Sequence, residues 1–124
     1  MRIVAIVALV LLGILPATAD AKRLRGIDIS RFQGSIDWPA VGKTKIAFAF
    51  AQASRGSGDD CLVRAGRCGA DNFYARNLAG AREAGIPIGA YHRAFASGRT
   101  RRLAKADSQK EARIFSKEIG RAHV

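Results

Sequence analysis

Hydrophobic and polar residues form alternating strand-like and helix-like segments along the chain. Three apolar segments, at 24–29, 45–53 and 86–92, have the length and composition of β-strands. The middle segment is apolar at nearly every position, which is typical of a strand buried on both faces of a parallel sheet. Its aromatic residues, Phe48 and Phe50, are therefore expected in the core.

One helix is predicted over 71–84, with Asp71 as the cap at its N-terminus. Within this segment, Tyr74, Leu78 and Ala81 are spaced i, i+4 and i+7, so they share one helical face. This apolar face is expected to pack on the sheet.

Two further helical segments complete the pattern. A short helical turn is predicted over 37–41, with Asp37 as its N-cap. A longer helix is predicted over 104–118, after a basic loop, with Ala112 and Phe115 on its apolar side.

The order of these elements defines the fold class. Strand, short helix, strand, helix, strand and helix follow one another, which is typical of βαβ units and of an α/β fold. A parallel sheet needs cover on both faces, and three strands cannot supply a closed core. We therefore expect residues 20–118 to form the opening, N-terminal part of a β/α barrel and not a finished domain.

Residues 1–19 have the organisation of a secretory signal peptide. A positive charge at Arg2 precedes an apolar run over 3–15, and small residues at 17–19 form a cleavage site. The run is shorter than the roughly 20 residues that span a bilayer. We expect cleavage after Ala19 and a secreted or periplasmic protein without stable membrane insertion; a retained N-terminal anchor is the alternative.

The C-terminal segment 119–124 has an unusual sequence. It matches what one reading frame of a common sequencing adapter encodes, so we interpret it as an artefact that follows a longer natural protein. Genomic codons that continue differently after Glu118 would support this interpretation.

The formal net charge of +11 favours an anionic partner. Nucleic acid fits poorly with export, and the basic residues do not gather on one helix or loop. An anionic polymer of the cell envelope fits better, and a general contribution to solubility is the alternative.

Cys61 and Cys68 are the two cysteines of the chain. In an oxidising compartment they are expected to form a disulfide that closes a short loop. Two cysteines without a neighbouring histidine do not make a closed zinc site, so we expect no metal.

Polar residues follow each predicted strand. Asp28 lies near the end of the first strand, Gln52 at the end of the second, and Tyr91 and His92 at the end of the third. Because the C-terminal ends of parallel strands meet at one edge, these side chains predict a site for a polar ligand. Structural roles are the alternatives: a loop-capping acid for Asp28, packing for Tyr91, and a hydrogen-bonded barrel residue for His92.

Short motifs follow one another in a fixed order along the chain. The first strand carries Gly-Ile-Asp-Ile-Ser at 26–30. Later motifs lie at consistent spacing: Gln-Gly at 33–34, Ile-Asp-Trp at 36–38, Asp-x-Phe at 71–73, Asn77, Ala81, Ala-Gly at 84–85, Gly-Ala-Tyr-His at 89–92, Glu-Ala at 111–112 and Phe115. This ordered set resembles glycoside hydrolase family 25, and the resemblance covers most of the chain after the signal peptide, about residues 26–115.

The resemblance implies the N-terminal part of an irregular TIM-like β/α barrel. It also implies a lysozyme that hydrolyses the β-1,4 bond between N-acetylmuramic acid and N-acetylglucosamine in peptidoglycan. Such hydrolysis needs two carboxyl groups. Asp28 matches the family's acid on the first strand, and Gln52, Tyr91 and His92 would bind the sugar. No cofactor is implied, and we expect a monomer. The family's Asp-x-Glu pair, which includes the proton donor, has no match here, so this fragment is expected to be inactive.

Two departures from the family pattern suggest an alternative. The family usually has Lys-Ala-Thr/Ser-Glu-Gly after its second strand, whereas this chain has Gln52 and Arg55 in place of the Lys and the Glu. In addition, Arg93 stands where an aromatic residue usually follows Tyr-His. A non-catalytic glycan-binding envelope protein on the same scaffold is therefore the alternative function.

Overall fold

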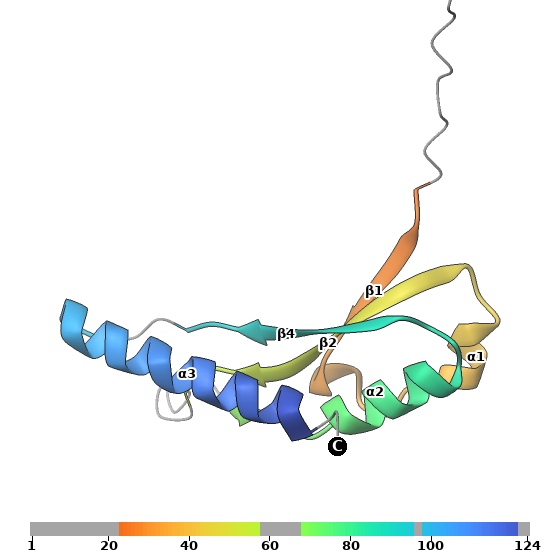
Figure 1. Cartoon of the computed structure of the whole chain (residues 1–124). Helices are drawn as coiled ribbons and strands as arrows, with labels where there is room; N and C mark the ends of the chain where they lie inside the picture. Colours follow the sequence, from red (N-terminus) through yellow and green to blue (C-terminus); the bar gives the residue numbers. More distant parts are fainter. Residues whose placement is uncertain (1–22, 58–67, 96–97, 122–124) are drawn as a thin grey trace, which may run out of the picture.

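The computed structural model describes residues 23–57, 68–95 and 98–121 (Figure 1). Strands and helices alternate along these residues, so the α/β class is confirmed. The elements are β1 (Arg25–Ile29), the 3-10 helix η1 (Arg31–Gln33), α1 (Trp38–Gly42), β2 (Ile46–Arg55), β3 (Gly69–Ala70), α2 (Tyr74–Glu83), β4 (Ile88–Arg93) and α3 (Arg101–Arg121).

The strand β2 is the centre of the sheet. β1 pairs with it in parallel along one edge and β4 in parallel along the other. The two-residue strand β3, which the sequence pattern does not predict, pairs antiparallel with the end of β2. Among the described residues β1 and β4 pair with no strand other than β2, so the sheet is open and the predicted barrel is not confirmed.

One face of the sheet packs against the helices, which lie on the same side of it (Figure 1). Tyr74, Leu78 and Ala81 are buried at this contact, which confirms the predicted apolar face of α2. Trp38 of α1 lies directly against Gly80 of α2. The buried core consists of Ile29, Trp38, Ala49, Ala51, Ala53, Tyr74, Leu78, Ala81 and Ile86.

The opposite face of the sheet is open, and this corrects the predicted burial of two aromatic residues. Phe50 is 50% exposed and Phe48 is only partly buried. Their rings cover Gly26 of β1 and Gly89 of β4, and they contact each other edge to face. Since no described element covers this face, the rings pack on neighbouring glycines instead of in a core.

The start of α2 also differs from the prediction. The helix begins at Tyr74, its N-cap is Phe73, and no side chain caps it. Asp71 is therefore not the N-cap: its carboxylate accepts from the N–H of Phe73, before the helix begins, and from Arg31 and Gln52, which are distant in the sequence. By contrast, Asp37 caps α1 as predicted, accepting a hydrogen bond from the backbone N–H of Ala40 at 3.0 Å.

The helix α3 is longer at both ends than the predicted 104–118. Phe115 packs against the core as expected, but Ala112 is exposed, so that part of the prediction is wrong. Glu111 is the buried residue of this helix. The face of α3 that points inward therefore carries Glu111 in place of Ala112, because Glu111 bonds to His92 and to the backbone N–H of Phe95.

The two terminal predictions stay untested. The proposed signal peptide at 1–19 and residues 122–124 lie outside the described residues, while 119–121 continue α3. Within the described residues, no helix combines the length and apolar character that crossing a membrane requires.

Candidate functional site

Asp28 and Tyr91 meet on the open face of the sheet. In the parallel ladders Asp28 pairs with Phe50, and Tyr91 pairs with Gln52. Partners in register, and residues two apart on one strand, point to the same face, so these side chains share it. The side chains of Asp28 and Tyr91 are hydrogen-bonded to each other, across β2.

Burial and the contact with Asp28 both favour the neutral, protonated form of the Tyr91 phenol. Burial, then the hydrogen bond to Asp28 and its negative charge, raise the pKa of Tyr91 to about 12. The phenol is therefore neutral at physiological pH, and its O–H donates a hydrogen bond to the Asp28 carboxylate. Because Asp28 itself is exposed, one of its oxygens can remain open to a ligand.

Gln52 lies beside this pair, but its side chain is buried and hydrogen-bonded to another protein residue. Its side chain is 2% exposed, and its amide nitrogen donates to Oδ2 of Asp71 at 3.1 Å. The structure therefore brings Asp28, Gln52 and Tyr91 together at one edge of the sheet. Gln52 is oriented by Asp71, which the sequence interpretation assigned to a helix cap.

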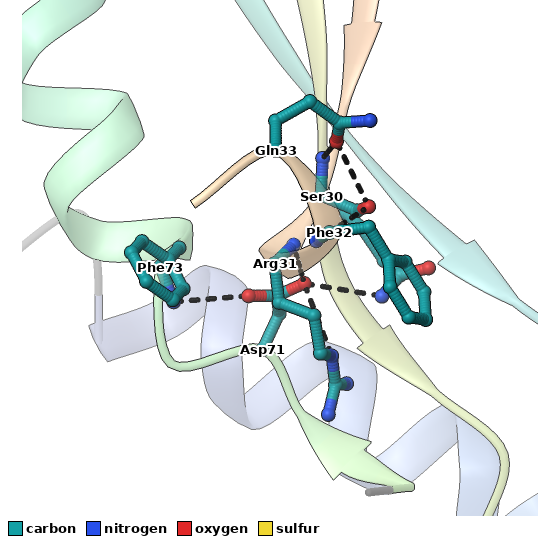
Figure 2. Close-up of polar contacts among 7 residues, drawn as sticks. Ser30, Arg31, Phe32, Gln33, Asp71 and Phe73 are labelled. Carbon is teal, nitrogen blue, oxygen red and sulfur yellow. Dashed lines mark hydrogen bonds and ion pairs between the residues drawn. The ribbon is translucent and has the colours of Figure 1, made fainter. Parts of the chain in front are cut away.

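Asp71 is the buried centre of this edge (Figure 2). Its side chain is fully buried and accepts hydrogen bonds from the backbone N–H groups of Arg31 and Phe73, both at 2.9 Å. Nε of Arg31 lies 3.6 Å from Oδ2. Asp71 therefore ties the turn after β1 to β2 and to the start of α2, which fixes where these three segments present their side chains.

The turn after β1 is also stabilised locally. Ser30 and Gln33 form a reciprocal capping box around η1: the Ser30 backbone N–H donates to Oε1 of Gln33 at 2.7 Å, and the Ser30 hydroxyl accepts from the N–H of Phe32. Figure 2 shows this turn next to Asp71. The box holds the chain immediately after Asp28 in one conformation.

His92 points away from this site, toward the helices. Its Nδ1 lies 2.8 Å from the Ser54 hydroxyl, and its Nε2 lies 2.8 Å from Oε2 of Glu111. Its ring also packs near Phe115. Both ring nitrogens are thus bonded to protein, which leaves neither free for a sugar, and the contacts argue for the structural alternative.

Glu111 is a partner that the sequence interpretation did not identify. It is 4% exposed, and it accepts from His92 and from the backbone N–H of Phe95. The sequence signals are its place in the Glu-Ala motif at 111–112 and its spacing of four residues from Phe115, which places both side chains on one face of α3.

Arg55 and Arg93, which depart from the family pattern, lie together at the ends of β2 and β4. The guanidinium carbon of Arg55 lies 4.9 Å from the ring centroid of Phe95 and 5.5 Å from that of Phe32. Arg93 also lies over Phe95, at 5.4 Å. Burial, then the charges of Arg93 and Arg31, lower the pKa of Arg55.

The predicted disulfide between Cys61 and Cys68 lies partly outside the described residues. Cys68 is disulfide-bonded, but Cys61 lies outside the described residues, so the predicted pair stays a prediction. Within residues 23–57, 68–95 and 98–121, no three His, Cys, Asp or Glu side chains gather as metal ligands.

Comparison with known proteins identifies the family. Residues 27–123 match the family of glycosyl hydrolases described as family 25. This match covers most of the chain, so the protein belongs to that family, and the resemblance noted in the sequence is confirmed.

Individual relatives agree with this assignment. Lysozyme M1 of Streptomyces globisporus is 36% identical over 74 residues, which are 60% of this chain and 22% of that protein. The CTP1L endolysin is 27% identical with a TM-score of 0.53, over 73% of this chain and 27% of that one. The autolysin LytC of Streptococcus pneumoniae, solved with a synthetic peptidoglycan ligand, has a TM-score of 0.58 and 22% identity, over 80% and 20% of the two chains.

These numbers also define what part of such a protein is present. The chain spans about a fifth of the length of lysozyme M1. The activity of a whole lysozyme therefore remains a proposal for this protein.

Proposed function

We propose that this chain is part of a peptidoglycan hydrolase of the lysozyme type. The enzyme cleaves the β-1,4 bond between N-acetylmuramic acid and N-acetylglucosamine. The observation that carries the proposal is the hydrogen-bonded pair of Asp28 and Tyr91 on the open, aromatic-lined face of the sheet. Family membership and the likeness to a lysozyme and an endolysin support the same reaction class.

In this proposal Asp28 assists the reaction as a carboxylate. It stabilises positive charge at the anomeric carbon or activates the group that attacks it. Tyr91 keeps the carboxylate oriented by donating a hydrogen bond to it, and Gln52 lines the sugar site beside them. Phe50 supplies an exposed apolar surface on the same face, on which a sugar ring can pack.

The reaction needs a second carboxyl group as proton donor. Asp71 does not serve, because it is fully buried and bonded to two backbone N–H groups and to Gln52. Glu111 is buried on the other face of the sheet and bonded to His92. The proposal therefore assigns the donor to a residue beyond those that the structure describes, and it applies to the full-length protein.

We further propose a monomeric protein that acts outside the cytoplasm on peptidoglycan and not on nucleic acid. The cell-wall activity in the names of its relatives and the net charge of +11 support this location and partner. Mass spectrometry of the protein recovered from the culture medium or periplasm tests it: the N-terminus is expected at Asp20.

The functional test uses the full-length gene product and a suspension of purified peptidoglycan. The wild-type protein is expected to clear the suspension, and Asp28→Asn to slow clearing by about a hundredfold or more. Asp37→Asn is the matched control, because Asn also caps a helix and Asp37 lies on α1, outside the site. Borohydride reduction of the products is expected to yield muramicitol, which identifies the bond that is cleaved.

Each result has a defined meaning. Wild-type clearing by Asp28→Asn removes Asp28 from the mechanism. Glucosaminitol in place of muramicitol overturns the proposed bond. If the wild-type protein binds peptidoglycan but does not clear it, the hydrolase proposal fails and the glycan-binding alternative, which no comparison favours, takes its place.

A further inference from the structure

Three arginines follow the residues of the proposed sugar site. Arg31 comes three residues after Asp28, Arg55 three residues after Gln52, and Arg93 two residues after Tyr91. Two or three residues along a strand correspond to about 7–10 Å. The arginine cluster, defined as Arg31, Arg55 and Arg93, therefore lies at the same edge of the sheet: Arg55 and Arg93 end β2 and β4, and Arg31 begins the turn η1 after β1.

The cluster has strongly uneven charge. The charges of Arg31 and Arg93 both act on Arg55, and they lower its pKa together with burial. Within the described parts of the chain, Asp71 is the carboxylate that contacts the cluster, through Nε of Arg31 at 3.6 Å. Three guanidinium groups against one carboxylate leave an excess of about two positive charges. Like charges held this close favour an anion between them.

Arg55 is held in a fixed orientation. The rings of Phe32 and Phe95 both lie within cation–π distance of its guanidinium group. Such packing restrains the planar group and leaves its in-plane N–H donors for hydrogen bonds. Its Nε is buried and has no acceptor among the described residues.

Arg31 supplies an independent observation. Its side chain is only 9% exposed, yet neither Nε nor Nη2 has a hydrogen-bond acceptor within the described segments. Buried guanidinium donors normally bond to carboxylates or phosphates, because leaving them unpaired is costly. Two neighbouring arginines with unpaired buried donors are the arrangement that a bidentate anion requires.

We propose that the arginine cluster binds a carboxylate of the peptide stem that peptidoglycan carries on its muramic acid. This inference rests on the proposed function and names a second part of the same ligand. A peptide attached to the sugar at Asp28 and Tyr91 reaches the cluster with about two residues, since each extended residue spans about 3.5 Å. The cluster would then select glycan chains whose peptide stems carry a free carboxylate.

The experiment measures binding of four probes to the purified full chain by calorimetry at one fixed salt concentration. Muramyl dipeptide carries one free carboxylate, and its amide is the same compound without that charge. Chitotetraose is a neutral glycan that reports the sugar site alone. Inorganic phosphate tests whether the cluster takes a phosphate instead.

For the wild-type chain we expect muramyl dipeptide to bind about tenfold more tightly than its amide. Arg55→Gln and the exposed Arg93→Gln are each expected to remove this preference, while chitotetraose binding stays unchanged. Arg93→Gln keeps the test decisive if the more buried Arg55→Gln does not fold. Arg25→Gln, at the opposite end of β1, removes the same charge and is expected to keep the preference.

Equal binding of the acid and the amide by the wild-type chain overturns the inference. So does a preference that survives in both arginine variants, or one that is lost equally in Arg25→Gln. Tight phosphate binding that depends on Arg55, without a preference for the acid, overturns the carboxylate in favour of phosphate. If the wild-type chain does not bind chitotetraose, the sugar site and hence the proposed function fail. If the same chain still prefers muramyl dipeptide over its amide, the arginine cluster remains supported.

Discussion

Asp28 and Tyr91 are hydrogen-bonded to each other although their strands, β1 and β4, both pair with β2 and not with one another. The bond therefore crosses the central strand on its open face. It joins the first and last parallel strands of the described sheet and holds a carboxylate and a neutral phenol side by side.

The first prediction concerns the titration of Tyr91. The pKa of Tyr91 is raised to about 12 by burial, then by the hydrogen bond and charge of Asp28. Asp28→Asn removes the negative charge and leaves only a weaker, neutral acceptor, so the pKa is expected to fall toward the ordinary value of 10 without reaching it. Absorbance at 295 nm measures this, with Tyr91→Phe to subtract Tyr74, whose pKa burial also raises.

The sign of the linked effect on stability follows from the same shift. Because the folded-state pKa of Tyr91 lies above its unfolded value, the contribution of the phenol to stability is complete below pH 10. It is lost as the pH rises from about 10 toward 12. A steeper loss of stability in this range for Tyr91→Phe than for the wild-type chain contradicts the assignment.

The second prediction concerns Asp71. Its buried carboxylate accepts from two backbone N–H groups and from Gln52, so Asp71→Ala leaves these donors unpaired. We expect the free energy of unfolding to fall by about 3 kcal/mol. Urea denaturation measures the loss. Asp37→Asn, which retains a capping side chain at the exposed N-cap of α1, is expected to change stability by less than about 0.5 kcal/mol.

The case of Asp71 explains what the sequence could and could not predict. The strands and α2 follow from local periodicity, and the meeting of Asp28 with Tyr91 follows from parallel topology. An aspartate shortly before a helix also has the local pattern of a cap. Its carboxylate does bond locally, to the N–H of Phe73, but its other partners, Arg31 and Gln52, are 40 and 19 residues away, and no local pattern contains such contacts.

The burial of Glu111 could not be predicted either, because its partners are also distant in the sequence. A glutamate on a basic helix is ordinarily exposed, and only the folded arrangement brings the His92 ring and the Phe95 N–H to it. The exposure of Phe50 had a different origin. A continuous apolar run predicts burial on both faces, but no described element covers the second face.

The third prediction concerns the hydrogen-bonded chain of Ser54, His92 and Glu111. The carboxylate of Glu111 accepts from Nε2, so neutral His92 is expected to carry its proton there and to accept from the Ser54 hydroxyl at Nδ1. Nitrogen chemical shifts of the ring distinguish this tautomer from the other. A proton on Nδ1 in the neutral ring contradicts the prediction.

The same chain predicts a loss of stability in Glu111→Ala. The variant leaves the His92 and Phe95 donors without their acceptor, so we expect the free energy of unfolding to fall by about 2–3 kcal/mol. Faster hydrogen exchange at the Phe95 amide should accompany it. Glu83→Ala, an exposed site on α2, is the control and is expected to change little.

The fourth prediction concerns the contact between α1 and α2. A methyl group at Gly80 would overlap the indole ring of Trp38, which is buried in the core. Although alanine favours a helix over glycine, Gly80→Ala is expected to destabilise the protein by about 1–3 kcal/mol, because the two helices must separate. Gly120→Ala makes the same change in α3, where no atom lies within 4 Å, and is expected to be neutral or stabilising. Thermal denaturation of both variants isolates the steric term, and equal effects at the two sites would show that Trp38 does not restrict this position.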